Sequence, residues 1–348
     1  MGIHRSSMDS DQPSLDEALE RVLMGEGLEL AGFHGFPEPV APVTLRKTVC
    51  YIVCAVIFNS ERPSLKCVLT FLLLSLHLTQ EQVLMVQEAK TECHGRWYLP
   101  AGRMEPGESI LEALEREVRE ETGRGCQPIT LLLVQEQGPQ WIRFIFLAEA
   151  AGGRLKTLAE ADEESLQAQW WDRESPLPLR SRDILVLIEA GIQYRQKRSF
   201  PVLQPVDFPS PVVCLRLVLT FISREEELFV LTSRTAGIAR LPVAVSLRAR
   251  VSQAVNRVME ESMPSSIIKA QVCGILGVQH NGRAPGRTDG VCFNTLVLLG
   301  RSESEPGAGS TPPLESERFS WHQVTNQSLR VQIMQRVKEG SVLPLQSL

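Results

Sequence analysis

The chain has 348 residues, of which 43% are hydrophobic and 22% are charged. These proportions are close to globular averages, so they exclude a largely disordered chain, and the length fits two domains of roughly 100–200 residues each. The 36 basic and 41 acidic residues give a net charge of −5. This balance argues against a nucleic acid polymer as the partner, because such a partner requires a large basic surface.

The sequence contains no signal for secretion or for membrane insertion. Its first residues include no apolar stretch of the kind found in secretory signal peptides. The most apolar run, Cys67–Leu78, is shorter than the ~20 residues that a spanning helix requires. The eight cysteines form no C-x-x-C pair, so they predict reduced core thiols rather than a zinc site. We therefore expect an intracellular, cytoplasmic protein without a membrane partner, and the sequence indicates no particular protein partner.

Residues 1–43 are predicted to form an N-terminal tail with one short amphipathic helix. Ser14 and Glu17 have the spacing of a capping box, which marks the start of a helix. Leu19 and Leu23 then follow at a helical interval, so one side of this helix is apolar.

A first α+β domain is expected over residues 44–198. Apolar runs bounded by turn residues predict its strands, and a 3.6-residue periodicity predicts its helices. In chain order, the predicted strands are 48–58, 82–87, 129–135 and 141–149, and the predicted helices are 109–122 and 182–197.

Residues 199–212 include four prolines and are predicted to link the first domain to a second one at 213–348. The second half repeats the order of strands and helices, and Leu241-Pro242 stands where Leu99-Pro100 stands in the first half. This order indicates an internal duplication. A chance similarity between two α+β domains is the alternative, because few residues are identical.

Three acids project from one face of the predicted helix 109–122. Glu117, Glu120 and Glu121 are spaced i, i+3 and i+4, so their carboxylates lie side by side and repel one another. A hard divalent cation reverses that cost, and carboxylate oxygens are the ligands that Mg²⁺ prefers. The pattern therefore predicts a metal site. An ordinary solvated acidic helix is the alternative.

The residues around the helix support the metal-site interpretation. Gly107 permits a tight turn before the helix, and Gly123 ends the helix as a glycine cap. The turn brings Glu108 back beside the carboxylate face, where Arg116 can pair with the acids and hold their rotamers.

The segment that contains these residues resembles the Nudix box, the signature motif of the Nudix hydrolase family. The motif is G-x5-E-x7-R-E-U-x-E-E-x-G-U, in which U is an aliphatic residue. The matching residues are Gly102, Glu108, Arg116, Glu117, Val118, Glu120, Glu121 and Gly123. Arg124 departs from the motif at its last position, where the family has a packing residue, so the end of the helix is affected more than the chemistry.

The resemblance extends over about residues 44–198 and implies an α/β/α sandwich that hydrolyses a nucleoside diphosphate linked to another moiety. It implies that the three helix acids and the carbonyl oxygen of Ala101 bind Mg²⁺ or Mn²⁺. One of the acids would be the general base, and Glu108 would support them. Such a site neutralises phosphate oxygens and positions a water in line with phosphorus.

Within the family, the segment Trp97–Glu108 most resembles members that cleave oxidised purine nucleoside diphosphates to monophosphates. That resemblance implies a small-molecule nucleotide substrate such as 8-oxo-dGDP, 8-oxo-GDP or 8-oxo-dADP. Leu84, Phe146 and Asp183 are the candidate contacts to the base. The alternatives are core positions for the first two and a helix N-terminal acid for the third. A nucleotide sugar or ADP-ribose is the alternative substrate.

Two features depart from the family pattern. Residues 59–81 form an insert where the family has a short hairpin, and this insert could pack elsewhere or seal the pocket. A sealed pocket would leave a non-catalytic nucleotide-binding module. In the second half, Arg257, Glu260 and Glu261 echo the motif only faintly, because no acid stands at its first acidic position. We therefore expect a degenerate Nudix-like domain that binds no metal.

Overall fold

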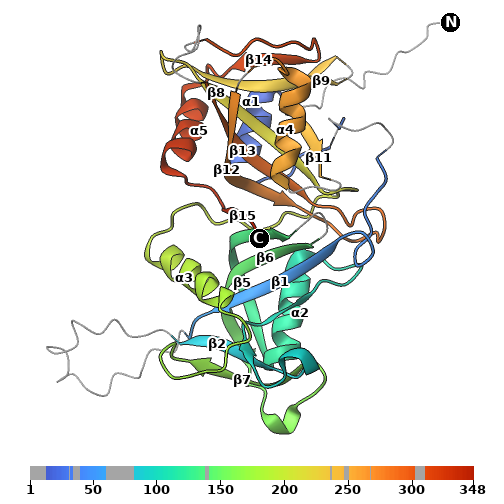
Figure 1. The fold of residues 1–348 in the computed structure, drawn as a ribbon, viewed down its shortest axis with the longest axis vertical. Helices are drawn as coiled ribbons and strands as arrows, with labels where there is room; N and C mark the ends of the chain where they lie inside the picture. The colour runs from blue at the N-terminus through green and yellow to red at the C-terminus, as the bar shows by residue number, and fades with distance from the viewer. Residues whose placement is uncertain are drawn as a thin grey trace, which may run out of the picture.

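The computed structural model describes residues 13–30, 32–33, 40–59, 82–137, 141–235, 237–246, 251–266, 268–301 and 310–348. Figure 1 shows two halves stacked along the long axis of the molecule, each built from β-sheet with helices packed against it. The predicted insert 59–81 lies outside the described residues, except for Asn59.

The first half is built around two sheets. The larger, five-stranded sheet has the order β15-β5-β6-β1-β4, in which β1 runs parallel to β6, and the smaller sheet has the order β3-β2-β7. The strands of the larger sheet are β1 (Cys50–Ile57), β4 (Ala101–Arg103), β5 (Arg124–Gln137), β6 (Trp141–Gly153) and β15 (Leu345–Ser347). Those of the smaller sheet are β2 (Val83–Glu88), β3 (Trp97–Tyr98) and β7 (Ser165–Trp171).

The longer helices of the first half are α2 (Ile110–Thr122) and α3 (Asp183–Gln196), and the short 3-10 helices are η2 (Thr91–Cys93) and η3 (Leu158–Glu160). The start of α2 is fixed by Ser109, whose side chain accepts a hydrogen bond from the backbone of Glu112 in the expected capping box. Gly123 ends the helix with a φ of 73°, a left-handed conformation that favours glycine. No helix of the described residues is both long and apolar enough to cross a membrane.

The described residues of the second half form a seven-stranded sheet and the helices α4 and α5. Its elements are β8 (Cys214–Ile222), β9 (Leu228–Thr235), β10 (Ile238–Arg240), β11 (Val243–Val245), α4 (Val251–Ser262), β12 (Ile268–Gln279), β13 (Cys292–Arg301), β14 (Phe319–Gln323) and α5 (Gln327–Glu339). Apolar side chains of β8 and β13 alternate between the two faces of this sheet, so both faces pack against other elements.

The strand pairing of the second half repeats that of the first. β8 pairs antiparallel with β11 and parallel with β13, as β1 pairs with β4 and β6. β9 pairs with β10 and β14, as β2 pairs with β3 and β7. β12 pairs with β13, as β5 pairs with β6. The repeat that the order of elements indicated is therefore present in the topology of the two halves.

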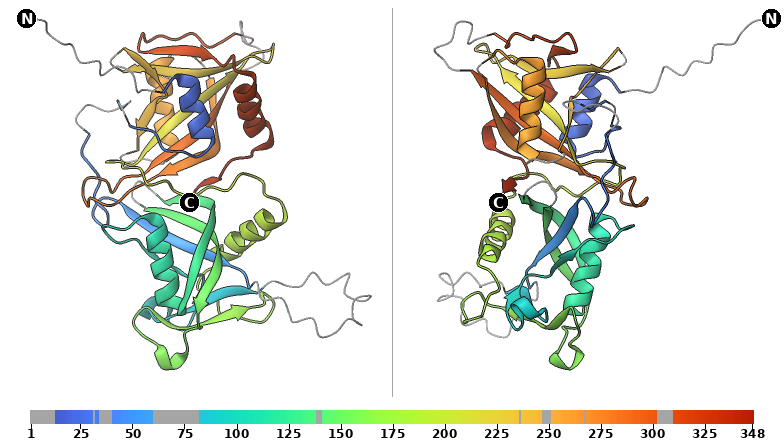
Figure 2. Two further views of the ribbon diagram at one scale, coloured as in Figure 1. Left: turned by 180° about the vertical axis from the view of Figure 1, so that it is seen from behind. Right: turned by 45° about the vertical axis from the view of Figure 1, so that its right-hand side comes forward.

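The N-terminal helix belongs to the core of the second half, although the sequence suggested a separate tail. α1 (Leu15–Leu23) begins at the predicted capping box and buries Leu19 and Val22 among residues such as Leu276 and Leu296. Figure 2 shows this helix, in blue, packed against the second half, whose residues come much later in the sequence. An amphipathic helix is stable only where its apolar face finds a partner, and here the partner comes from residues distant in sequence.

The C-terminal strand belongs to the sheet of the first half, although the sequence assigned it to the second. β15 runs parallel to β5, with Gln346 opposite Gln135 and Ser347 opposite Glu136. It covers the edge of β5, whose backbone groups need partners on that side. The N-terminal helix thus completes the second half, and the C-terminal strand completes the first half.

A shared core and the Pro-rich linker join the two halves. The ring of Tyr51 meets that of His280 at 5.7 Å, and Phe144 stacks on Phe293 at 6.3 Å. In the linker, the amide of Leu203 donates to Thr130 Oγ1 of the first half at 2.9 Å. The fold is therefore one packed unit in which the two halves support each other.

We expect Leu19→Ala to destabilise the protein by about 2–5 kcal/mol, the usual result of truncating a buried leucine. Leu19 is 0% exposed in the second-half core, whereas Met24, just beyond the helix, is 74% exposed. Urea denaturation of both alanine variants measures the difference. Equal stability of Leu19→Ala and Met24→Ala would contradict the packing of α1 on the second half.

Candidate active site

Strand β4 lies directly on the helix acids. A Cβ atom added to Gly102 would lie 2.0 Å from the carboxyl carbon of Glu117, so any other residue at this position would displace that carboxylate. The amide of the preceding residue, Ala101, donates to Glu121 Oε2 at 2.8 Å. The strand and the helix are therefore fixed against each other by the acids that the sequence singled out.

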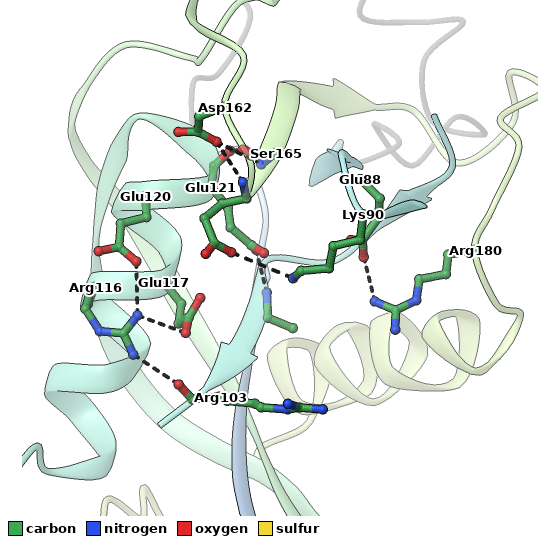
Figure 3. Close-up of polar contacts among 12 residues, drawn as sticks. Glu88, Lys90, Arg103, Arg116, Glu117, Glu120, Glu121, Asp162, Ser165 and Arg180 are labelled. Atoms are coloured by element: carbon green, nitrogen blue, oxygen red, sulfur yellow. Dashed lines mark hydrogen bonds and ion pairs between the residues drawn. The ribbon is translucent and has the colours of Figure 1, made fainter. Parts of the chain in front are cut away.

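Arg116 lies at the centre of the acidic face. Its guanidinium donates to both carboxylate oxygens of Glu108, at 2.5 and 3.1 Å, and to one oxygen each of Glu117 and Glu120, at 2.9 and 3.0 Å. Figure 3 shows the guanidinium between the helix acids and the main chain of Arg103. Charge-assisted bonds of this kind hold the carboxylates close together despite their mutual repulsion.

The acids differ in their exposure and in their affinity for protons. Burial raises the pKa of Glu117, although Arg116 opposes the shift. Burial raises the pKa of Glu121 well above its usual value, because only the Ala101 amide and distant charges compensate. The side chain of Glu120 is 48% exposed, which makes it the helix acid most open to solvent.

A cavity of about 1040 Å³ opens beside these acids. Glu117 and Glu120 line it, together with Ala101 and Gly102 of β4. Six basic side chains also line it, and these are Arg46, Lys90, Arg103, Arg116, Arg143 and Arg180. Four further acids, Glu105, Asp162, Glu164 and Asp183, complete a wall that carries both signs of charge. The volume suits a ligand as large as a nucleotide, and the basic side chains are available to its phosphate oxygens.

A second polar cluster in the same cavity is formed by Asp183, Arg143 and Tyr98. Asp183 Oδ2 accepts from Arg143 and from the Tyr98 hydroxyl, both at 2.8 Å, and Arg143 also donates to that hydroxyl at 2.6 Å. Burial alone would raise the pKa of Asp183, but hydrogen bonds from Ser181, Arg143 and Tyr98 lower it. The carboxylate is therefore an anion with two fixed donors on one of its oxygens.

The other oxygen of this carboxylate is free to act as an acceptor. Asp183 Oδ1 is buried and has no hydrogen-bond partner among the described residues. A buried, unpaired carboxylate oxygen is costly in a resting protein, and in a cavity it offers a site for an N–H donor of a ligand.

The C-terminal strand extends the polar cluster. Gln135 Oε1 accepts from Arg143 Nε at 2.9 Å, and Gln135 Nε2 donates to Gln346 Oε1 of β15 at 3.0 Å. Leu348 itself lines the cavity. Residues at the far end of the chain thus contribute to the wall of the cavity in the first half.

Half of the predicted residues line the cavity, and these are Ala101, Gly102, Arg116, Glu117, Glu120 and Asp183, whereas Glu108, Glu121, Leu84, Phe146, Gly107 and Gly123 do not. Leu84 and Phe146 are 0% exposed in the hydrophobic core. Phe146 lies on the face of β6 opposite to Arg143, because side chains alternate along a strand. Glu121 is buried and accepts a hydrogen bond from the Ala101 amide of β4, which does line the cavity.

Sequence reasoning missed Arg143, Tyr98 and Gln135. A signal for Arg143 existed, because an arginine within the apolar run Trp141–Ala148 places a charge in a buried strand, and buried charges are usually functional or paired. Gln135 follows four apolar residues in the same way. No signal pointed to Gln346 or Leu348, whose strand pairing is distant in sequence.

The donor set of the acidic face suits a divalent cation. Carboxylate oxygens and a neighbouring loop backbone are ligands for hard cations such as Mg²⁺ and Mn²⁺. Among the described residues, however, no group of three or more His, Cys, Asp or Glu side chains is arranged to hold a metal ion. Arg116 bonds Glu117 through Oε1 and Glu120 through Oε2, so the guanidinium does not engage the second oxygen of either carboxylate, which is the oxygen that would face a cation.

Comparison with known proteins matches this site to a family. A model of the NUDIX domain matches residues 69–187. The chain is 60% identical to the 8-oxo-dGDP phosphatase NUDT18 of Danio rerio, over 98% of this chain and 100% of that protein. It is 45% identical to the human protein of the same name, over 94% and 97% of the two chains.

Among solved structures, the chain is similar to an ADP-ribose pyrophosphatase of Streptococcus suis, with a TM-score of 0.30 and 20% identity over 41% of this chain and 92% of that one. The identity to the zebrafish and human proteins extends through both halves, and the Nudix box stands on α2 beside the cavity. The chain belongs to the Nudix hydrolase family.

Proposed function

We propose that this protein hydrolyses oxidised purine nucleoside diphosphates to monophosphates and phosphate, and so removes them from the nucleotide pool. The preferred substrates are 8-oxo-dGDP and 8-oxo-GDP, with 8-oxo-dADP as a further candidate. The observation that carries the proposal is a single cavity that is lined both by acids of α2 and by Asp183, one of whose carboxylate oxygens has no partner among the described residues. The relatives that match nearly the whole chain are named 8-oxo-dGDP phosphatases.

We propose that the acids of α2 hold the divalent cation that Nudix hydrolases need. Glu117 and Glu120 would bind it from the cavity side, and Glu121 and the carbonyl oxygen of Ala101 from the loop side. Mg²⁺ is the proposed ion, and Mn²⁺ is the alternative. When bound, such a cation neutralises phosphate oxygens and lowers the pKa of a coordinated water.

The protein side chains would supply orientation and proton transfer. Arg116 bonds Glu117 and Glu120 and holds them in place, and Glu108 in turn holds the guanidinium of Arg116. Glu120, the most exposed acid of the face, is the proposed general base that accepts the proton of the attacking water. Arg103, Lys90 and Arg180 line the cavity and would bind phosphate oxygens.

Asp183 would select the base. Its Oδ1 atom accepts an N–H group of the purine, while Tyr98 and Arg143 hold its other oxygen. A carboxylate with a lowered pKa stays ionised at neutral pH, so it accepts hydrogen bonds and donates none. This preference favours a base edge rich in N–H donors, as guanine and its 8-oxo form have.

A second candidate substrate is a nucleotide linked to a further moiety, such as ADP-ribose or a nucleotide sugar. The cavity of about 1040 Å³ favours this alternative, because it lies at the upper end of the volumes typical of small-molecule sites. The two candidates differ in what the distal end of the substrate contacts, so a substrate panel separates them.

Glu120→Gln is expected to lower kcat by at least about 10²-fold, because it removes the proposed base and one carboxylate ligand. Stability should change little, since Glu120 lies at the surface. Phosphate release from 8-oxo-dGDP with Mg²⁺ measures the effect, and chelation of the cation should abolish the activity. Glu115→Gln, on the same helix but outside the cavity, is the matched control. Full activity of Glu120→Gln would exclude this residue as the base.

The native enzyme should release phosphate from 8-oxo-dGDP with a higher kcat/KM than from dGDP, and should cleave ADP-ribose more slowly. Asp183→Ala should lower kcat/KM for 8-oxo-dGDP by about 10–100-fold, because the variant lacks the oxygen that accepts a hydrogen bond from the base. The ratio of kcat/KM for 8-oxo-dGDP to that for 8-oxo-dADP should therefore fall. Steady-state kinetics on the four nucleotides test both statements. An unchanged ratio in the variant would show that Asp183 does not read the base.

Gln346→Leu should raise KM for the substrate by about three- to tenfold with little change in kcat. The variant loses the hydrogen bond between Gln346 and Gln135, the residue that accepts from Arg143. Gln346 supports Gln135, which in turn supports Arg143. Ser347→Ala is the control, because Ser347 bonds Glu136 instead. Equal KM values for the two variants would argue that β15 acts only as a covering strand.

A further inference from the structure

The register of the strands allows the two halves to be compared residue by residue. In the first half, the amide of Ala55 on β1 donates to the carbonyl of Pro100 at 2.9 Å. In the second half, the amide of Leu217 on β8 donates to the carbonyl of Pro242 at 2.8 Å. β8, β10 and β11 therefore stand in the second half where β1, β3 and β4 stand beside the catalytic cavity.

The second half has a cavity of about 310 Å³ at this equivalent place. Its wall includes Arg240 and Val243, which by this register correspond to Tyr98 and Ala101 of the catalytic cavity. Arg216 on β8 also lines it. A volume of this order falls within the range of small-ligand sites, so the duplication has retained a pocket as well as a fold.

A buried polar cluster lies against this pocket. Arg216, Gln279 and Asn294 are almost fully buried, and Arg216 donates to the side-chain oxygens of the other two. The guanidinium also donates to the carbonyls of Leu28 and Glu29, at 2.8 and 3.0 Å. All four acceptors are uncharged. A buried charge on neutral acceptors is unfavourable as core packing, and it is typical of a site that recognises a ligand.

The main chain that follows α1 occupies the site. The amide of Leu28 donates to Gln279 Oε1 at 3.1 Å, and Gln279 Nε2 donates to the Leu28 carbonyl at 2.9 Å. Asn294 Nδ2 donates to the carbonyl of Glu26 at 3.4 Å. The carboxamide of Gln279 thus forms hydrogen bonds with both the N–H and the C=O of Leu28.

We propose that the cluster of Arg216, Gln279 and Asn294 beside this pocket is a nucleobase-binding site, which the protein's own segment 26–29 fills in this conformation. A base with a lactam edge, an N–H next to a C=O as in guanine, presents the same donor and acceptor as Leu28. Arg216 fixes the direction of Gln279, because the carboxamide oxygen must face the guanidinium. The Leu28 carbonyl accepts from both Arg216 and Gln279. A lactam oxygen has two lone pairs for these two donors, whereas the ring nitrogen of adenine has one, so the site favours guanine over adenine.

The second site binds without hydrolysis. Thr122 at the end of α2 and Ser262 at the end of α4 each donate to the carbonyl four residues earlier, which aligns the two helices. In that alignment, Arg257 stands where α2 has Glu117, and its guanidinium donates to the carbonyl of Val245. A cation in place of the first acid removes the proposed catalytic chemistry and leaves recognition of the base.

Hydrogen–deuterium exchange of the full chain, read by mass spectrometry, tests the proposal with GMP and AMP as probes. In the native protein, GMP should slow exchange in residues 272–281 and 290–297 and speed exchange in residues 26–29. Leu28→Pro removes the N–H that donates to Gln279, so segment 26–29 is held less firmly in the site. GMP should therefore protect the second half of this variant at about a tenfold lower concentration than in the native protein. Glu29→Pro keeps that amide and is the matched control. AMP should give no protection there.

Gln279→Leu provides an independent check, because it removes the carboxamide that would hydrogen-bond the base and changes no residue of the catalytic cavity. GMP protection of the second half should disappear in this variant, while phosphate release by the first half is unchanged. Protection confined to the first half in both the native protein and Leu28→Pro would overturn the proposal. So would equal protection of the second half by AMP and GMP.

Discussion

The position of the Arg116 guanidinium among the carboxylates of Glu108, Glu117 and Glu120 is the constraint on which the site depends. Three acids on one helix face repel one another in the absence of a cation. Arg116 neutralises that repulsion, and the capping box and Gly123 fix where the helix begins and ends. The acids are thereby held at the cavity wall before any ligand binds, which is the preorganisation that catalysis by charged groups requires.

The sequence predicted this part of the molecule because its determinants are close together along the chain. The spacing of the acids, the cap at Ser109 and Gly123 operate within a single turn or loop. Arg143, Gln135 and Gln346 meet only through the pairing of strands that are distant in sequence, and no local pattern encodes such pairing. Phe146 illustrates a related limit of local patterns. Alternation places neighbouring side chains on opposite faces of a strand, but the face that borders the cavity is known only once the register is known.

The exchange of chain ends makes the two halves interdependent. α1 fills the core of the second half, and β15 completes the sheet of the first. The aromatic contacts of Tyr51 with His280 and of Phe144 with Phe293 join the cores between them. A change in the seating of segment 26–29 would therefore act on the same packed unit that carries the catalytic cavity. This arrangement explains why a half that lacks the first of the three helix acids is retained as part of one folded body.

The central claim is that the acidic face of α2 gathers a divalent cation at the cavity. Titration of the full-length protein with Mn²⁺, followed by the loss of the free-ion signal in electron paramagnetic resonance, measures this directly in the presence of a nucleoside monophosphate. We expect tight uptake by the native protein, uptake weakened by at least about tenfold in Glu117→Gln, and native uptake in Glu115→Gln. No uptake by the folded native protein, or equal uptake by Glu117→Gln, would contradict it.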